Sequence, residues 1–163
     1  MPPIPLCPCS SGVRYSQCCA KYHRGQAEAP DAEVLMRSRY SAFARREVEY
    51  LWRTLHPEHP DRAQSKEEII RALRAVAGSH KYSGLRILDR RLTDETGTSL
   101  VLFHARVFQL GKDISFVECS SFRHDGTGWR YYSGDSVAPS SLPKPIDALT
   151  LADFPTAAGE AKS

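Results

Sequence analysis

Four cysteines stand within thirteen residues near the start of this 163-residue chain: Cys7, Cys9, Cys18 and Cys19. They form two close pairs in the pattern Cys-x-Cys-x8-Cys-Cys, and zinc prefers four soft ligands of this kind in a tetrahedron. Residues 1–30 are rich in Cys, Pro, Gly and Ser and show no helical or strand periodicity, so a metal would have to organise them. A closed four-thiolate site leaves no open coordination position, which favours a structural or recognition role over catalysis.

The metal interpretation depends on the redox compartment. No apolar run approaches the ~20 residues needed to span a bilayer, and the first residues lack the basic flank and apolar stretch of a secretion signal. We therefore expect a cytoplasmic protein without a membrane partner, in which the cluster binds one zinc ion per chain. A redox-active thiol cluster and a chance grouping are the alternatives. His23 is a possible substitute ligand for Cys19, and the isolated Cys119 is typical of a buried small residue.

The apolar pattern predicts helices first and strands afterwards. Asp31 is a candidate N-cap for two helices, or one bent helix, that end at His56-Pro57. A further helical segment opens with a capping-box pattern at Ser65 and ends at Gly78. Glycine-containing gaps of hairpin length then separate four predicted strands. These strands are expected near residues 83–93, 99–110, 114–124 and 128–133. The order favours an α+β fold with helices packed on one face of an antiparallel sheet.

Composition divides the chain into three parts. We expect a knuckle over residues 1–26, an α+β domain over residues 31–136, and a tail over residues 137–163 that is rich in Pro, Ala and Ser. The tail is expected to be partly disordered, above all in its last eight or so residues. Because the α+β domain has apolar stripes of its own, we expect it to fold without the knuckle.

One carboxylate falls on the more aromatic face of the third predicted strand. Strand alternation places Glu118 on the same face as Phe116 and Phe122, and we expect this face to meet the helices. A buried carboxylate must be paired, hydrogen-bonded or protonated, so the side chain needs an explanation.

Arg37 and Arg39, with Tyr40 and His56, are the candidate partners of Glu118. In the structural interpretation they form an ion pair or hydrogen-bond network, and Glu118→Gln would destabilise the fold by leaving an arginine unpaired. In the alternative, these residues line a ligand pocket in which Glu118 or His56 acts as acid or base and Tyr40 is a further catalytic candidate.

Several segments resemble known families. Cys7-Pro-Cys-Ser-Ser-Gly, with Tyr15 and Cys18-Cys19, resembles the SEC-C motif. That motif was named for the zinc-binding C-terminus of the SecA translocation ATPase, where it contacts the SecB chaperone and is linked to ribosome binding. Four further segments resemble the YchJ family of uncharacterised bacterial proteins. They are Ala32–Phe43, Tyr50–Pro57, Phe116–Phe122 and Trp129–Gly134.

The resemblance implies a nuclear-transport-factor-like, cystatin-like fold, in which a curved sheet wraps around helices to form a cone with a cavity. It implies no settled activity. One departure concerns position 10, which is Ser where the motif usually has Gly.

Two classes of function follow. In the first, which we favour, the knuckle recognises a partner protein or the ribosome, while the cone serves as a scaffold or holds a small ligand. In the second, the cavity is an enzyme site for proton transfer on an apolar small molecule, with Glu118 or His56 as acid or base. The net charge of +3 is compatible with nucleic acid but more typical of a solvated basic face. The sequence shows no Ser-His-Asp order, phosphate-binding glycine loop or metalloprotease helix.

Overall fold

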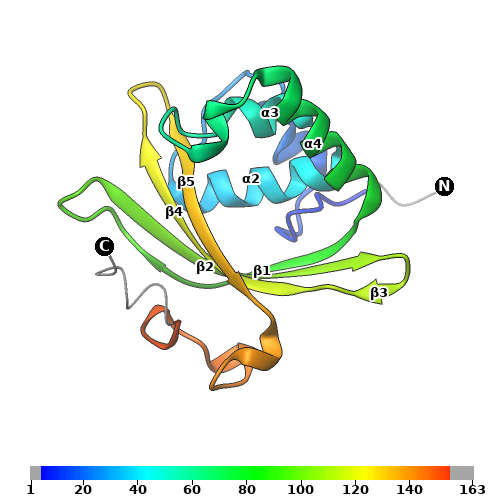
Figure 1. Ribbon diagram of the computed structural model, residues 1–163, viewed down its shortest axis with the longest axis vertical. Helices are drawn as coiled ribbons and strands as arrows, with labels where there is room; N and C mark the ends of the chain where they lie inside the picture. Colours follow the sequence, from blue (N-terminus) through cyan, green and yellow to red (C-terminus); the bar gives the residue numbers. More distant parts are fainter. Residues whose placement is uncertain (1–4, 155–163) are drawn as a thin grey trace.

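The computed structural model describes residues 5–154. Three helices cover one face of a curved antiparallel sheet, which confirms the predicted α+β architecture (Figure 1). These helices are α2 (Ala32–Arg45), α3 (Val48–Arg53) and α4 (Lys66–Ser79). The knuckle precedes them and contains a short 3-10 turn, η1 (Tyr15–Gln17), and one helical turn, α1 (Ala20–His23). No helix in the described part of the chain is both long and apolar enough to cross a membrane.

The helices begin at the caps that the sequence predicts. Asp31 accepts a hydrogen bond from the backbone N–H of Val34 at 2.8 Å and so starts α2. Arg46 adopts a left-handed conformation, with φ of 61°, and ends α2, so α2 and α3 are two helices and not one bent helix. At α4, Ser65 and Glu68 form the reciprocal capping box, with backbone-to-side-chain distances of 3.1 and 3.2 Å.

The sheet has the order β1-β2-β4-β5, and the short β3 pairs with β2. The strands are β1 (Lys81–Arg91), β2 (Thr98–Gln109), β3 (Lys112–Asp113), β4 (Phe116–His124) and β5 (Trp129–Val137). The third predicted strand corresponds to β4 alone, since β3 lies in the turn predicted before it, and the fourth runs several residues further than predicted. β1 is an edge strand with an irregularity between Tyr82 and Gly84, which matters for the knuckle described below.

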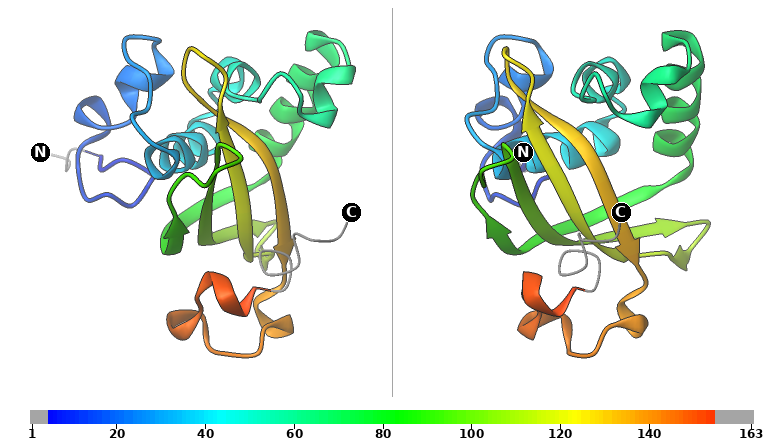
Figure 2. Two further views of the ribbon diagram at one scale, coloured as in Figure 1. Left: turned by 90° about the vertical axis from the view of Figure 1, so that its left-hand side faces the viewer. Right: turned by 60° about the vertical axis from the view of Figure 1, so that its left-hand side comes forward.

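The two faces of the sheet have different coverings. The inner face packs against α2 and α3, through residues such as Val101, Phe103 and Phe122. The outer cluster, defined here as Leu100, Leu102, Val117, Cys119, Leu149 and Phe154, lies on the opposite face. Figure 2 shows the C-terminal segment, residues 138–154, lying against that face.

The C-terminal segment thus belongs to the folded body. It contains three short 3-10 turns, η3 (Pro139–Ser141), η4 (Ile146–Ala148) and η5 (Leu151–Asp153). Phe154 is fully buried and Leu149 nearly so. The expectation of disorder in the last eight or so residues falls on residues 155–163, outside the described residues.

Candidate metal centre and ligand pocket

The four knuckle cysteines meet at one point. Their Sγ atoms all lie within 4.8 Å of one another, with 3.6 Å between Cys9 and Cys18 and 3.9 Å between Cys18 and Cys19. These distances are too long for a disulfide, whose sulfurs lie about 2.05 Å apart. Four ligands at ~2.3 Å from a tetrahedral metal stand roughly 3.8 Å from each other, so the sulfurs have the spacing of a metal site.

The thiols lie close enough to change one another's pKa values. Hydrogen bonds from Cys19 and Cys9 lower the pKa of the Cys7 thiol, while the bond with Cys7 raises the pKa of Cys19. Thiols this close cannot all ionise without a compensating cation, whereas a divalent metal would hold all four as thiolates.

The loop between the cysteine pairs turns through two residues in the left-handed region, Ser10 (φ 66°) and Gly12 (φ 81°). That conformation is the physical reason for glycine at both places in such a motif. Here the hydroxyl of Ser10 accepts a hydrogen bond from the backbone N–H of Leu85 at 3.0 Å. The departure at position 10 therefore links the knuckle to the irregular part of edge strand β1.

His23 bridges the knuckle to α2 and does not join the sulfur cluster. Its Nε2 donates to the carbonyl oxygen of Ser38 at 2.8 Å, which leaves Nδ1 to accept from the hydroxyl of Tyr15 at 2.7 Å. Burial lowers the pKa of His23, in agreement with this neutral form. Both ring nitrogens are engaged, so His23 is not a substitute ligand for Cys19 in this structure.

Further contacts dock the knuckle on α2, beside the helix layer and away from α4 (Figure 2). Arg37 donates from Nη1 to the carbonyl oxygen of Cys9 at 2.8 Å. The guanidinium of Arg45 lies 3.6 Å from the centre of the Tyr15 ring. Since every one of these contacts depends on the loop conformation around the sulfurs, the cluster is positioned to control how the knuckle meets the domain.

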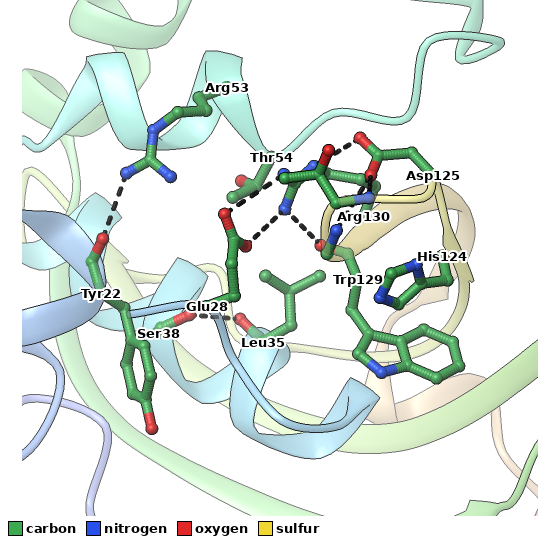
Figure 3. Close-up of polar contacts among 12 residues, drawn as sticks. Tyr22, Glu28, Leu35, Ser38, Arg53, Thr54, His124, Asp125, Trp129 and Arg130 are labelled. Carbon is green, nitrogen blue, oxygen red and sulfur yellow. Dashed lines mark hydrogen bonds and ion pairs between the residues drawn. The ribbon is translucent and has the colours of Figure 1, made fainter. Parts of the chain in front are cut away.

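The segment that follows the knuckle is tied to the β4–β5 hairpin by an ion-pair triad (Figure 3). Arg130, only 4% exposed, contacts Glu28 and Asp125, each at 2.9 Å. A Cβ at Gly128 would lie 2.2 Å from Glu28 Oε1, so glycine there leaves room for the pair. Arg53 of α3 also donates to the carbonyl oxygen of Tyr22 at 3.1 Å, as Figure 3 shows.

A pocket of about 540 Å³ lies between the helices and the inner face of the sheet. Its walls are mainly apolar and come from α2, α4, β2 and β4, including Met36, Phe43, Leu73, Val107 and Phe116. Side chains with polar groups also line it, namely Arg39, Tyr40, His59, Asp61, Gln64, His80, Tyr82, Glu118 and Tyr131. Apolar walls with few polar groups are typical of small-molecule sites.

Glu118 lies on the pocket-facing side of β4, as its strand alternation predicted. Its Oε2 accepts hydrogen bonds from the hydroxyl of Tyr131, at 3.0 Å, and from that of Ser120. A Cβ at Gly134 would lie 2.2 Å from Oε2 and 2.3 Å from the Tyr131 hydroxyl, so glycine is needed where these groups meet. Burial raises the pKa of Glu118 more than these bonds lower it.

The predicted ion pair between Glu118 and an arginine is wrong. Arg37 pairs with Glu33 at 3.3 Å instead. Arg39 donates from Nη1 to Leu51 O at 2.9 Å and Thr54 Oγ1 at 2.6 Å. Among residues 5–154, no carboxylate oxygen lies within 4.0 Å of a guanidinium nitrogen of Arg39, so Arg39 forms no ion pair there.

Tyr40 lines the pocket with its ring, but its hydroxyl is occupied by backbone. It accepts from the N–H of Gly84 at 2.7 Å and donates to the carbonyl oxygen of Arg106 at 3.3 Å. Burial raises the pKa of Tyr40 to about 12. Tyr40 therefore supports the irregular part of β1 and is not free to exchange a proton with a ligand.

The structure separates His56 from Glu118 and places a different histidine in the pocket. His56 is not among the lining side chains; its Nδ1 accepts from the N–H of Glu58 at 3.1 Å, and its ring packs against Tyr132. His59 lines the pocket, 5.5 Å from the Tyr131 ring centre, and burial lowers its pKa. Both histidines precede a proline in the same loop, so no sequence signal distinguished them.

Comparison with known proteins agrees with this geometry. The family described as "YchJ, middle NTF2-like domain" matches residues 31–134. The chain is 37% identical over 129 residues to the YchJ protein of Shigella dysenteriae serotype 1, covering 79% of this chain and 82% of that protein.

Two solved structures share the fold. One is the solution structure of a SEC-C motif containing protein from Rhodopseudomonas palustris, with a TM-score of 0.69 and 30% identity over 80% of this chain and 98% of that one. The other is the crystal structure of a SEC-C motif containing protein from Psychrobacter arcticus, with a TM-score of 0.66 and 23% identity. It covers 94% of this chain and 95% of its own, and shows the fold alone.

Proposed function

The chain belongs to the YchJ family, as its sequence indicated, and we propose that it is a zinc-clamped protein that binds a small apolar ligand in its α+β domain. The observation that carries the proposal is the pocket of about 540 Å³, whose apolar walls surround a few polar groups. Ligand sites in proteins have volumes of about 300–1,000 Å³ and this same lining.

The zinc part of the proposal rests on the four sulfurs. Their spacing fits a tetrahedral ion, and all four ligands are cysteines, the set that closed structural zinc sites use. The ion would keep the loop around Ser10 in the conformation that contacts Leu85 and α2. Its role is then to clamp the knuckle to the domain, and any chemistry belongs to the pocket.

Elemental analysis of purified protein tests this assignment. We expect about one zinc per chain in the wild type and loss of zinc in the Cys18→Ser, Cys19→Ser double variant. Cys119→Ala is the matched control, since Cys119 lies in the outer cluster and should leave the zinc content unchanged. Full zinc content in the double variant would refute the assignment.

A matched pair of variants on α4 tests the pocket. Ala72 and Ala75 are both exposed, but only Ala72 borders the pocket. A tryptophan at Ala72 should therefore obstruct the entrance, while a tryptophan at Ala75 should not. We expect the neutral apolar dye N-phenyl-1-naphthylamine to become fluorescent on binding wild type and Ala75→Trp, and to bind Ala72→Trp at least about tenfold more weakly. Equal binding by the two variants would place the dye elsewhere and count against the proposal.

A second candidate function is recognition of a partner protein or the ribosome through the knuckle. It is favoured by three exposed basic side chains, Arg14, Lys21 and Arg24, around a site that would carry a charge of about −2 with zinc bound. Co-sedimentation with ribosomes at low salt tests it. Binding should fall when these three residues are changed to alanine but not when the exposed Arg71 and Arg74 of α4 are changed. Equal sedimentation of both variants would refute this role.

A further inference from the structure

We propose that the ligand of the pocket is an apolar molecule with a terminal carboxylate, and that Arg39 is the group that receives this carboxylate. The inference rests on the proposed function, because it names the chemistry of the same pocket. It starts from a charge inside the domain that nothing in the described chain neutralises directly.

Arg39 is that charge. The residue is only 6% exposed, and a guanidinium stays protonated in proteins. Its two hydrogen bonds within the described chain go to uncharged acceptors, Leu51 O and Thr54 Oγ1. No carboxylate among residues 5–154 forms an ion pair with it. A buried charge without an opposite charge is costly, so the site gains from an incoming anion.

The unused donors of Arg39 are accessible from the pocket. Both of its hydrogen bonds use Nη1, which leaves Nε and Nη2 without an acceptor among residues 5–154. Among residues 5–154, the one side-chain nitrogen or oxygen that is both fully buried and without a hydrogen-bond partner is Nε of Arg62. Nε and Nη2 of Arg39 are therefore not fully buried, and an incoming ligand can reach them. Arg39 lines the pocket, and its guanidinium lies 4.8 Å from the centre of the Tyr131 ring. A planar guanidinium with two free donor positions matches a carboxylate.

Glu118 does not stand in for the missing anion. Its Oε2 accepts two hydrogen bonds, from Tyr131 and Ser120, whereas Oε1 has no hydrogen-bond partner within the described part of the chain. The side chain lines the pocket. Burial raises the pKa of this carboxyl more than its two hydrogen bonds and the charge of Arg39 lower it, which favours a proton on Oε1. A protonated Glu118 would donate to the ligand carboxylate and not repel it. Asp61, the other acidic group of the lining, has a side chain 56% exposed, so water screens its charge.

The pocket thus offers a polar end and an apolar body. Arg39, Glu118 and Tyr131 supply the polar end, and the aliphatic and aromatic side chains of α4 and the sheet supply the apolar body. A molecule with a hydrocarbon body and one carboxylate fits both regions, because its body packs against the apolar walls and its carboxylate neutralises Arg39. An alcohol leaves the charge of Arg39 without a counter-charge, and an amine adds a second positive charge.

Competition against bound N-phenyl-1-naphthylamine, with the full zinc-loaded chain, tests the head group. The competitors are decanoate, decan-1-ol and decylamine, which share one chain length. We expect decanoate to displace the dye at concentrations about tenfold lower than decan-1-ol, and decylamine to be the weakest. In Glu118→Gln, which keeps a donor and removes any negative charge, decanoate should bind at least as tightly as in wild type, and clearly weaker binding would count against the inference.

Two variants of Arg39 complete the test. Arg39→Lys keeps the charge and should keep the preference for decanoate, whereas Arg39→Met should bind decanoate and decan-1-ol about equally. If Arg39→Met does not fold, the three competitors on wild type and Glu118→Gln still decide the matter. Equal binding of decanoate and decan-1-ol by wild type, or strongest binding of decylamine, would overturn this inference and leave the proposed function standing. Failure of the dye and all three competitors to bind would refute both.

Discussion

Replacing Glu118 by glutamine distinguishes a buried ion pair from a protonated carboxyl. The sequence alone predicted a loss of stability, because an arginine partner would be left uncompensated. The structure reverses the expected sign. Glu118 has no arginine within ion-pair distance in the described chain, and its two donors, Tyr131 and Ser120, can be satisfied equally by the amide oxygen of glutamine.

The direction of the effect follows from the pKa of Glu118, which burial raises. The folded state holds this proton more tightly than the unfolded chain, where a glutamic acid has a pKa of about 4.5. The stabilisation that this bound proton contributes to the free energy of unfolding is therefore complete below that value. It is lost as the pH rises through the higher pKa of the folded state. Above the unfolded value the folded state must either keep a proton that the unfolded chain has released or hold an ionised carboxyl in its interior, so wild type loses stability as the pH rises. Each tenfold change in the acid constant corresponds to about 1.4 kcal/mol.

Urea unfolding of wild type and Glu118→Gln between pH 4 and pH 8 measures this difference. We expect equal stability near pH 4 and a growing advantage of the variant as the pH rises, of at least about 1 kcal/mol at pH 7. Glu95→Gln, in the exposed β1–β2 loop, is the matched control and should show no such trend. A variant that is less stable than wild type, with a deficit that grows with pH, would show that ionised Glu118 compensates Arg39 and would refute the reasoning.

Three further substitutions test individual contacts. Gly134→Ala inserts a methyl group 2.2 Å from the Glu118 carboxylate and should lower the free energy of unfolding by about 1–3 kcal/mol, whereas Gly78→Ala, with nothing within 4 Å, should not; equal effects in thermal denaturation would contradict the steric argument. Ser10→Ala leaves the backbone N–H of Leu85 without its acceptor and should cost about 1 kcal/mol in urea unfolding; no change would mean that this contact does not hold the knuckle. Arg130→Met leaves the carboxylates of Glu28 and Asp125 without their arginine and should lower the free energy of unfolding by about 3 kcal/mol. This value is near the lower limit for a buried pair because the side chain of Glu28 is 39% exposed. An unchanged free energy of unfolding would show that the triad does not stabilise the fold.

Local signals in the sequence were enough to predict the four-cysteine cluster and the order of the helices and strands. The cysteine spacing identified the four sulfurs because residues so close along the chain have few ways to lie apart. Asp31 and Ser65 marked helix starts through hydrogen bonds that span only three residues. Strand alternation placed Glu118 on the inner face because period 2 is fixed by strand geometry.

The contacts that the sequence did not reveal join residues far apart in the chain. The C-terminal segment looked like a tail because Leu149 and Phe154 stand among short turns without any periodicity, yet both are buried against the sheet. Arg39 donates hydrogen bonds to Leu51 and Thr54 and forms no ion pair with Glu118, because of the way α3 packs beside α2. Such choices among nearby partners follow from tertiary geometry and leave no trace in spacing.

Methyl NMR during titration with a neutral apolar ligand tests the central claim most directly, because the two faces of the sheet provide an internal comparison. Ile69, Leu73 and Val107 line the pocket, whereas Leu100 and Leu102 belong to the outer cluster. With decan-1-ol added to the zinc-loaded chain, the account predicts saturable shifts of the pocket methyl groups at one ligand per chain and unchanged signals from the outer cluster. Shifts centred on the outer cluster, or none at saturating ligand, would contradict the claim that this domain holds a small apolar ligand between its helices and its sheet.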